Sequence, residues 1–172
     1  GCENLRTHAE NVQKYGLPVV VAINRFPTDT PAELDIVRKF CEEMGVPSSL
    51  SEVVARGGEG GLDLATKIKK IVDETPGTPN FYYKTADPIK SKIETIAREI
   101  YRADGVDYTE EAENSIKVLE ENGLANWPIC MAKTQASLSD DPKKRNAPRG
   151  WRLQVRGVKV SNGAGFIVAL TG

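Results

Sequence analysis

The amino-acid sequence predicts an α/β fold, in which helices flank a parallel sheet and a small antiparallel β element follows at the C-terminus. Two observations predict it. Across residues 1–142, short unbroken apolar runs alternate with helical patterns. Such runs are typical of strands that are buried on both faces of a parallel sheet. Residues 151–160 instead alternate apolar with polar side chains, which indicates a half-exposed strand. We therefore expect an α/β part over residues 1–142 and a small β element over residues 143–172.

The first part of the chain reads as helix, strand and helix. Residues 2–15 carry apolar side chains at helical spacing, and residues 18–23 form an apolar run that predicts a strand buried on both faces. Thr30, Pro31 and Glu33 then predict the start of a helix. They supply an N-cap hydroxyl, a proline at the first helical position and a capping-box carboxylate.

The pattern continues with a second strand and further helices. Residues 50–55 indicate a strand, residues 56–61 a glycine-rich turn, and residues 62–72 a helix. The apolar face of this helix is predicted from Leu62, Ala65, Ile68 and Val72. A strand, helix, strand, helix order favours parallel strands.

Beyond a Pro/Gly linker at residues 75–79, Asp87 and Pro88 predict the cap of the most amphipathic helix of the chain. Its apolar face consists of Ile89, Ile93, Ile96 and Ile100. Thr109 predicts the start of another helix. Residues 129–132 predict a short buried strand, and a turn at Asn162-Gly163 precedes a return strand over residues 166–170.

Composition narrows the class of protein. The chain has 172 residues, 23 Lys plus Arg against 24 Asp plus Glu, and a net charge of −1, so no global field attracts nucleic acid or an anionic membrane. Cys2, Cys41 and Cys130 lie far apart in sequence, which argues against a disulfide framework or a zinc site and favours the cytoplasm. The longest apolar run, residues 17–23, is too short to span a bilayer.

The polar cluster after the strand predicted at residues 129–132 is the first candidate ligand site. Polar side chains massed where a core strand ends are how α/β proteins build such sites. Lys133 could pair with a phosphate or carboxylate, and Ser137 and Ser139 could hydrogen-bond a base. The alternative is a polar loop that satisfies itself through Asx and Ser turns.

The loop at residues 24–30 is the second candidate, because it follows a predicted parallel strand. Phe26 could stack on a planar ring, and Arg25 or Asp29 could pair with polar groups. The alternative is a capped turn whose Phe26 packs into the core.

Other candidates are weaker. The glycine-rich loop at residues 57–61 could cradle a phosphate, but no G-x-x-x-x-G-K-[ST] occurs in the sequence, and a tight turn for close packing is favoured. His8 has no nucleophile or carboxylate placed with it and is expected at the surface. Cys130 is expected to be a core thiol, and Trp127 and Trp151 are expected to pack at strand edges.

Several long motifs resemble those of the formate–tetrahydrofolate ligase (formyltetrahydrofolate synthetase) family. Residues 127–142, WPICMAKTQASLSDDP, are similar to the family signature LPICMAKTQYSLSDDP. Residues 22–30 read AINRFPTDT, as in the family, and residues 164–172 match its terminal strand. Two motifs depart from the family: Val54 replaces the tryptophan of SEVWAKGGEGG, and Arg102 replaces the first glycine of IYGADGV.

The resemblance implies an ATP-dependent ligase of one-carbon metabolism. It would join formate to tetrahydrofolate through formyl phosphate, giving 10-formyltetrahydrofolate, ADP and phosphate, with magnesium required and a monovalent cation favouring activity. It also implies that the chain is roughly the last third of a family protein. The P-loop and the main catalytic basic residues would lie in the N-terminal part, so these residues alone are expected to be inactive. Family members are typically homotetramers.

The resemblance also implies roles for residues. Phe26 would stack on one face of the pterin, and Val54 stands where the tryptophan covers the other face, so half of the aromatic clamp is missing. The implied folate-binding set is Asn24, Arg25, Phe26, Asp29 and Val54, and the implied nucleotide-proximal set is Lys133, Thr134, Ser137 and Ser139. The rival hypothesis is a non-catalytic module of the same descent that binds a pterin or a partner protein.

Overall fold

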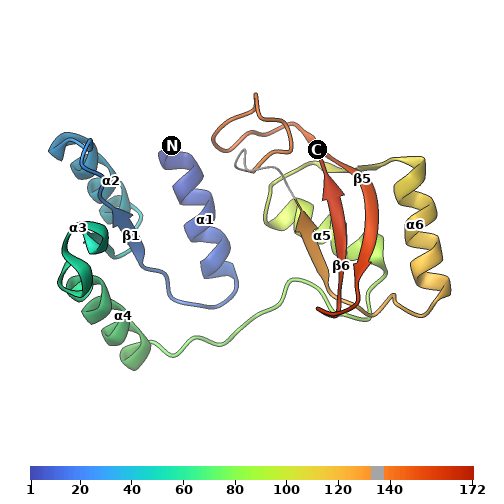
Figure 1. Cartoon of the computed structure of the whole chain (residues 1–172), viewed down its shortest axis with the longest axis horizontal. Helices are drawn as coiled ribbons and strands as arrows, with labels where there is room; N and C mark the ends of the chain where they lie inside the picture. The colour runs from blue at the N-terminus through green and yellow to red at the C-terminus, as the bar shows by residue number, and fades with distance from the viewer. Residues whose placement is uncertain (133–137) are drawn as a thin grey trace. The chain divides into compact units, whose positions relative to one another are not determined.

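The computed structural model describes residues 1–132 and 138–172, and these form two compact units (Figure 1). The N-terminal unit is Gly1–Asn80 and the C-terminal unit is Phe81–Gly172. Mostly parallel strands flanked by helices, with one antiparallel pair near the C-terminus, confirm the predicted fold class. The division at residues 142/143 stays a prediction about domains. The strands on its C-terminal side lie in one sheet with strands on its N-terminal side.

The N-terminal unit is built around a two-stranded parallel sheet. Its elements are α1 (Cys2–Lys14), β1 (Val21–Asn24), α2 (Pro31–Glu43), β2 (Ser48–Ser51), the one-turn helix α3 (Val53–Arg56), the 3₁₀ helix η1 (Gly57–Gly61) and α4 (Leu62–Glu74). The register runs from Val21 opposite Ser48 to Asn24 opposite Ser51. Since α2 connects β1 to β2, their carboxyl ends meet at one edge of the sheet.

The predicted capping box starts α2. The Thr30 hydroxyl accepts a hydrogen bond from the backbone N–H of Glu33 at 3.3 Å, and the Glu33 carboxylate accepts one from the N–H of Thr30 at 2.9 Å. The Thr30 hydroxyl also donates to the Glu33 carboxylate at 2.7 Å, and this bond first, then the bond from the Thr30 N–H, holds the pKa of Glu33 below its ordinary value. Local sequence therefore specifies where the helix begins, and with it the length of the loop after β1.

Two strand predictions in this unit are wrong in part. The run at residues 50–55 leaves the sheet after Ser51, because Glu52 hydrogen-bonds Gly60 and residues 53–56 form a helical turn. The strand at residues 18–23 is not buried on both faces, since Ala22 and Asn24 of β1 are exposed. In a two-stranded sheet both strands are edge strands, so neither lies between two neighbours.

Apolar side chains remain exposed across the N-terminal unit. The predicted helix at residues 62–72 forms, but its predicted apolar face does not pack: Leu62 is 63% exposed, Ile68 45% and Val72 63%. α4 contacts β2 through polar groups instead, with Ser49 Oγ bonded to Asp63 Oδ2 at 2.5 Å. A stripe of apolar side chains on an otherwise polar helix is typical of a surface that another part of a protein covers.

The C-terminal unit has a four-stranded mixed sheet in the order β3-β5-β6-β4. Its elements are α5 (Ile89–Glu99), β3 (Gly105–Tyr108), α6 (Glu110–Glu121), β4 (Ile129–Ala132), β5 (Arg152–Ser161) and β6 (Phe166–Thr171). β5 and β6 pair antiparallel, while β3 and β4 run parallel to β5 and β6 respectively. β3 is not predicted from the sequence, because its four residues carry too short a pattern to separate from a loop.

One continuous core fills this unit between the sheet and helices α5 and α6 (Figure 1). Ile89 and Ile93 of α5 are fully buried, as the helical spacing predicts, but Ile96 and Ile100 of the predicted face are only partly buried. Ile89 and Ile93 pack with buried side chains from the other elements, namely Val106, Ala112, Ile116, Trp151, Leu153, Val155, Val158, Ile167 and Ala169. The described residues of this unit therefore have a complete apolar core of their own.

A β-bulge aligns β5 with this core. Leu153 and Val155 are at odd positions and Val158 and Val160 at even positions, so in a regular strand the two pairs would point to opposite faces of the sheet. The register shifts between Val155 and Gly157, so one extra residue turns both pairs toward the same face of the sheet. Leu153, Val155 and Val158 are buried in consequence.

The cap predicted for α5 is wrong. Asp87 accepts a hydrogen bond from the N–H of Lys84 at 2.8 Å, and no side chain caps the helix at Pro88. The N–H of Ile89 donates instead to Glu120 of α6 at 3.3 Å. The cap therefore comes from a neighbouring helix, which local sequence does not reveal.

Cys130 is exposed, so the expected core thiol is also wrong. β4 lies at the edge of the sheet, and only its alternate residues Ile129 and Met131 pack against the core. Trp151 is buried and Trp127 packs against the core, which confirms their predicted packing role. His8 is exposed, as predicted.

Arg102 adopts a left-handed backbone conformation, with φ of 59°, just after α5. Helices commonly end with glycine in this conformation, because a Cβ crowds the following carbonyl. We expect Arg102→Gly to raise the free energy of unfolding of the C-terminal unit by about 0.5–1 kcal/mol. Thermal denaturation measures it, with Arg102→Ala as the matched control that removes the side chain and keeps the Cβ. Equal stability of the two variants would contradict the prediction.

Candidate functional site

The loop between β1 and α2 is held as a tight turn by its own residues. The N–H of Phe26 donates to Asp29 Oδ2 at 2.7 Å, and the N–H of Asp29 donates to the carbonyl of Phe26 at 3.0 Å. One oxygen of the Asp29 carboxylate, which was predicted to bind a ligand, therefore accepts a hydrogen bond within the loop and stabilises its shape. Its bond to Phe26 fixes the backbone from which the aromatic side chain projects.

Phe26 is 61% exposed. The alternative in which it packs into the core is therefore wrong. A phenylalanine ring held in water on an ordered turn leaves apolar area uncovered, which costs free energy unless something planar or apolar stacks on it. The exposed ring makes Phe26 the most specific candidate for ligand binding in the N-terminal unit.

Two hydrogen-bonded contacts join the β1–α2 loop to the segment after β2. The N–H of Arg25 donates to the carbonyl of Ser51 at 3.0 Å, and its guanidinium Nη1 lies 2.7 Å from Glu52 Oε1. Glu52 Oε2 also pairs with Arg56 at 3.2 Å. These contacts bring the AINRFPTDT and SEVVARGGEGG motifs side by side at the carboxyl ends of two adjacent parallel strands.

Glu52 is a site residue that the sequence reasoning did not select. Arg25 first, and then Arg56, hold the pKa of its carboxyl below the ordinary value, so it stays ionised at neutral pH. The signal that could have found it is charge complementarity: an arginine and a glutamate each follow directly after neighbouring parallel strands.

The glycine-rich loop at residues 57–61 allows close packing of the backbone, as the interpretation favoured from the sequence predicts. A Cβ on Gly60 would lie 2.5 Å from the backbone carbon and oxygen of Glu52. Gly60 also accepts a hydrogen bond from the N–H of Glu52 at 3.0 Å. The loop therefore needs glycine at this position so that η1 can approach the end of β2.

Val54 is 92% exposed on α3, the segment that Glu52 ties to the β1–α2 loop. Asn24, the last residue of β1, is exposed as well. The structure thus brings the predicted folate-binding residues to one sheet edge of the N-terminal unit, with two exposed apolar side chains among them.

The second predicted site belongs to the C-terminal unit. Lys133, Thr134 and Ser137 lie outside the described residues. Ser139 is buried, and its hydroxyl accepts a hydrogen bond from the N–H of Asp141 at 2.8 Å. Asp140 accepts one from the N–H of Gln154 at 2.9 Å. Among the described residues of the cluster, Ser139 therefore bonds within its own loop and Asp140 bonds to β5.

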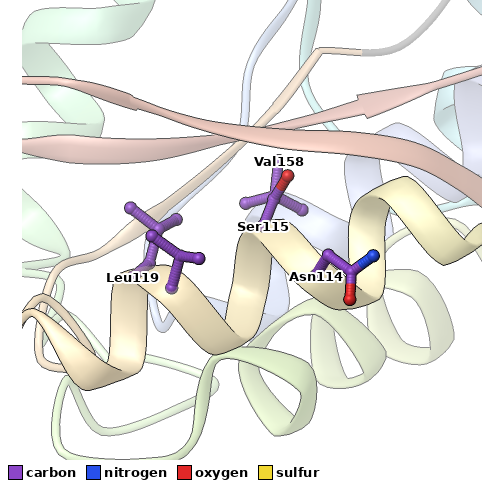
Figure 2. Close-up of a pocket in the computed structure, with 5 residues that line it drawn as sticks. Asn114, Ser115, Leu119 and Val158 are labelled. Atoms are coloured by element: carbon purple, nitrogen blue, oxygen red, sulfur yellow. The ribbon is translucent and has the colours of Figure 1, made fainter.

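A shallow hollow of about 310 Å³ lies between α6 and β5. Asn114, Ser115, Val118, Leu119 and Val158 line it (Figure 2). It contains no charged side chain and none of the predicted site residues, so its chemistry does not match a folate or nucleotide site.

Metal-binding and membrane-spanning features are absent from residues 1–132 and 138–172. Within these ranges, no group of three or more His, Cys, Asp or Glu residues could hold a metal ion. None of the helices there has the length and apolar character needed to cross a membrane. We therefore assign no described residue to magnesium.

Comparison with known proteins agrees with the motifs. The family model described as formate–tetrahydrofolate ligase matches residues 1–172. A formate–tetrahydrofolate ligase of Symbiobacterium thermophilum is 51% identical over 173 residues, an alignment that covers 100% of this chain and 31% of the relative. The chain thus spans about a third of the length of this curated relative.

Proposed function

The chain belongs to the formate–tetrahydrofolate ligase family, and from this premise we propose that it supplies the tetrahydrofolate-binding part of an ATP-dependent ligase. The complete reaction joins formate to tetrahydrofolate through formyl phosphate in the cytoplasm. The single observation that carries the assignment to this chain is the exposed ring of Phe26, held on an ordered turn at the carboxyl end of a parallel strand.

The chemistry of the loop fits a pterin. A pterin is a planar heterocycle, and an aromatic side chain stacks on such a ring with little loss of conformational entropy. Asn24 and Arg25 directly precede Phe26 in the chain and would offer polar groups for the edge of the heterocycle. Arg25 is already oriented by Glu52, which lowers the entropy lost when a ligand binds.

Val54 leaves the second face of the pterin with weaker contacts. Valine contributes apolar area but has no π system for stacking. We infer that the site binds tetrahydrofolate more weakly than a site with two aromatic side chains. The same observation favours the second candidate function, a non-catalytic module that binds a pterin or a partner protein.

Phosphate chemistry would come from the rest of the polypeptide. The 172 residues contain no P-loop motif. We propose that an N-terminal P-loop part handles ATP, magnesium and formate, and that Lys133, Thr134, Ser137 and Ser139 lie near the nucleotide. The exposed apolar side chains of α4 support this proposal, because another part of the same polypeptide could cover them. Robust ATP-dependent formylation by the 172-residue chain alone would contradict the proposed division of labour.

We expect Phe26→Ala to weaken tetrahydrofolate binding at least about fivefold, because one stacked aromatic face is worth about 1 kcal/mol or more. Titration calorimetry of the 172-residue chain with tetrahydrofolate measures the affinity. Phe81→Ala is the matched control, since Phe81 is also exposed, at 78%, but lies in the other unit. Equal affinities of the two variants would remove Phe26 from the site.

The same titration also tests a substitution that is expected to increase the affinity for tetrahydrofolate. Val54→Trp restores a second aromatic face and is expected to tighten binding by about tenfold. Val72→Trp, at another exposed valine of the N-terminal unit, is the control for a general effect of tryptophan. If both tryptophan variants tighten binding alike, position 54 does not form the second face. In the complete ligase, formylation by Val54→Trp separates an enzyme limited by folate affinity from a non-catalytic module.

A further inference from the structure

Lys92 of α5 is a fully buried cation that the proposed function does not use. Its ammonium nitrogen Nζ donates three hydrogen bonds, all to backbone carbonyl oxygens. The distances are 3.1 Å to Thr85, 2.5 Å to Ala125 and 2.7 Å to Trp127. A buried lysine is ordinarily paired with a carboxylate, so a cage of three carbonyl oxygens is an unusual partner.

The number of hydrogen bonds identifies the charge state. A neutral amine has two N–H groups, while an ammonium has three, so all three bonds require the protonated form. Burial lowers the pKa of Lys92, and the nearby charges of Asp87 and Glu120 act in the opposite direction. Both carboxylates are bonded to backbone N–H groups, of Lys84 and Ile89 respectively. The carbonyl dipoles therefore replace the hydration shell of the cation, as they do for ions in carbonyl-lined sites.

The cage joins α5 to the segment that leads into β4. Trp127 and its two successors all have bonded backbone groups: the Trp127 carbonyl binds Lys92, the Pro128 carbonyl accepts from Ile167, and the N–H of Ile129 donates to the hydroxyl of Tyr83 at 2.9 Å. Without the cation, the carbonyls of Ala125 and Trp127 would lose a strong partner inside the unit.

We propose that the carbonyl oxygens of Thr85, Ala125 and Trp127 form a binding site for an ammonium-type cation, filled by Nζ of Lys92, that fixes the backbone at the start of β4. The proposal stands independently of the folate assignment. It assigns to Lys92 a positioning role through its charge, beyond the packing of its hydrocarbon stem.

Chemical rescue tests the proposal. Lys92→Ala removes the atoms of n-propylammonium from the side chain, so that ion fits the vacated space. We expect the Tm of the variant to fall by about 10 °C or more, and millimolar n-propylammonium to recover at least half of the loss. Hydrogen exchange of residues 125–132 should slow again with the same ion. n-Propanol, similar in size but uncharged, and sodium chloride at equal ionic strength should not rescue.

Two further measurements keep the proposal falsifiable if Lys92→Ala does not fold. Lys92→Met keeps most of the stem without the charge, and a Tm equal to that of the unmodified chain would overturn the role of the cation. In the unmodified chain, nitrogen NMR should show a protonated Lys92 ammonium whose protons exchange slowly. Lys69 and Lys70, whose side chains are 77% and 70% exposed, supply the fast-exchanging reference. Fast exchange at Lys92 would also overturn the proposal, as would equal rescue by n-propanol.

Discussion

Replacing Gly60 by alanine is expected to destabilise the N-terminal unit by about 2 kcal/mol and to weaken tetrahydrofolate binding more than tenfold. The added Cβ would lie 2.5 Å from backbone atoms of Glu52 and 2.9 Å from the N of Val53. Backbone cannot swing aside as a long side chain can, so η1 must move away from the end of β2. That movement displaces Glu52, and with it the guanidinium of Arg25.

Gly58→Ala is the matched control for this experiment. A Cβ on Gly58 meets nothing within 4 Å, and the residue does not need a left-handed backbone. Denaturant unfolding gives the stability and calorimetry gives the affinity. If Gly60→Ala is no less stable than Gly58→Ala, the close approach to Glu52 is wrong. If Gly60→Ala is less stable than Gly58→Ala but binds tetrahydrofolate equally well, the close packing at Gly60 is confirmed and the proposed position of the folate site is wrong.

Ile93→Ala is expected to destabilise the C-terminal unit by about 3 kcal/mol, within the range for large-to-small changes at buried positions. Ile93 is fully buried at the centre of the core between α5 and the sheet, so the alanine leaves a cavity. Since a domain of this size is stable by only about 5–15 kcal/mol, the loss is a large share of the total.

Chemical denaturation followed by hydrogen exchange measures this effect and locates it. Val118→Ala is the control, since Val118 is 53% exposed on α6 and its truncation should cost less than about 1 kcal/mol. Faster exchange is expected in residues 81–132 and 138–172. A loss spread equally over residues 1–80 would contradict the division into two compact units.

Sequence reasoning worked where the determining interactions are local. The capping box of α2, the start of α6 at Thr109 and the burial of Ile89 and Ile93 on α5 depend on residues within a few positions of one another. The motif at residues 22–30 likewise identifies the candidate ligand loop and its aromatic residue, because the motif is contiguous in the chain. The roles of Lys133, Thr134 and Ser137 stay predictions.

Sequence reasoning failed where a partner comes from elsewhere in the fold. Glu120 caps α5 from another helix, and nothing near Asp87 in the sequence indicates it. The exposure of Cys130 follows from the place of β4 at the sheet edge, and strand order is a tertiary property. The bulge in β5 depends on its pairing with β6, so the alternation of residues 151–160 could not show how both apolar sets reach the core.

Short-range patterns and long motifs in the chain are enough to indicate the α/β class, the family and the candidate folate loop. The folded chain is needed to show that Phe26 is exposed, that Arg25 is held by Glu52 across two strands, and that Lys92 is an internal cation bound by three carbonyls. All three features have one cause. Burial and hydrogen bonding between residues distant in the chain are set by how the elements pack, and one sequence pattern is compatible with several packings.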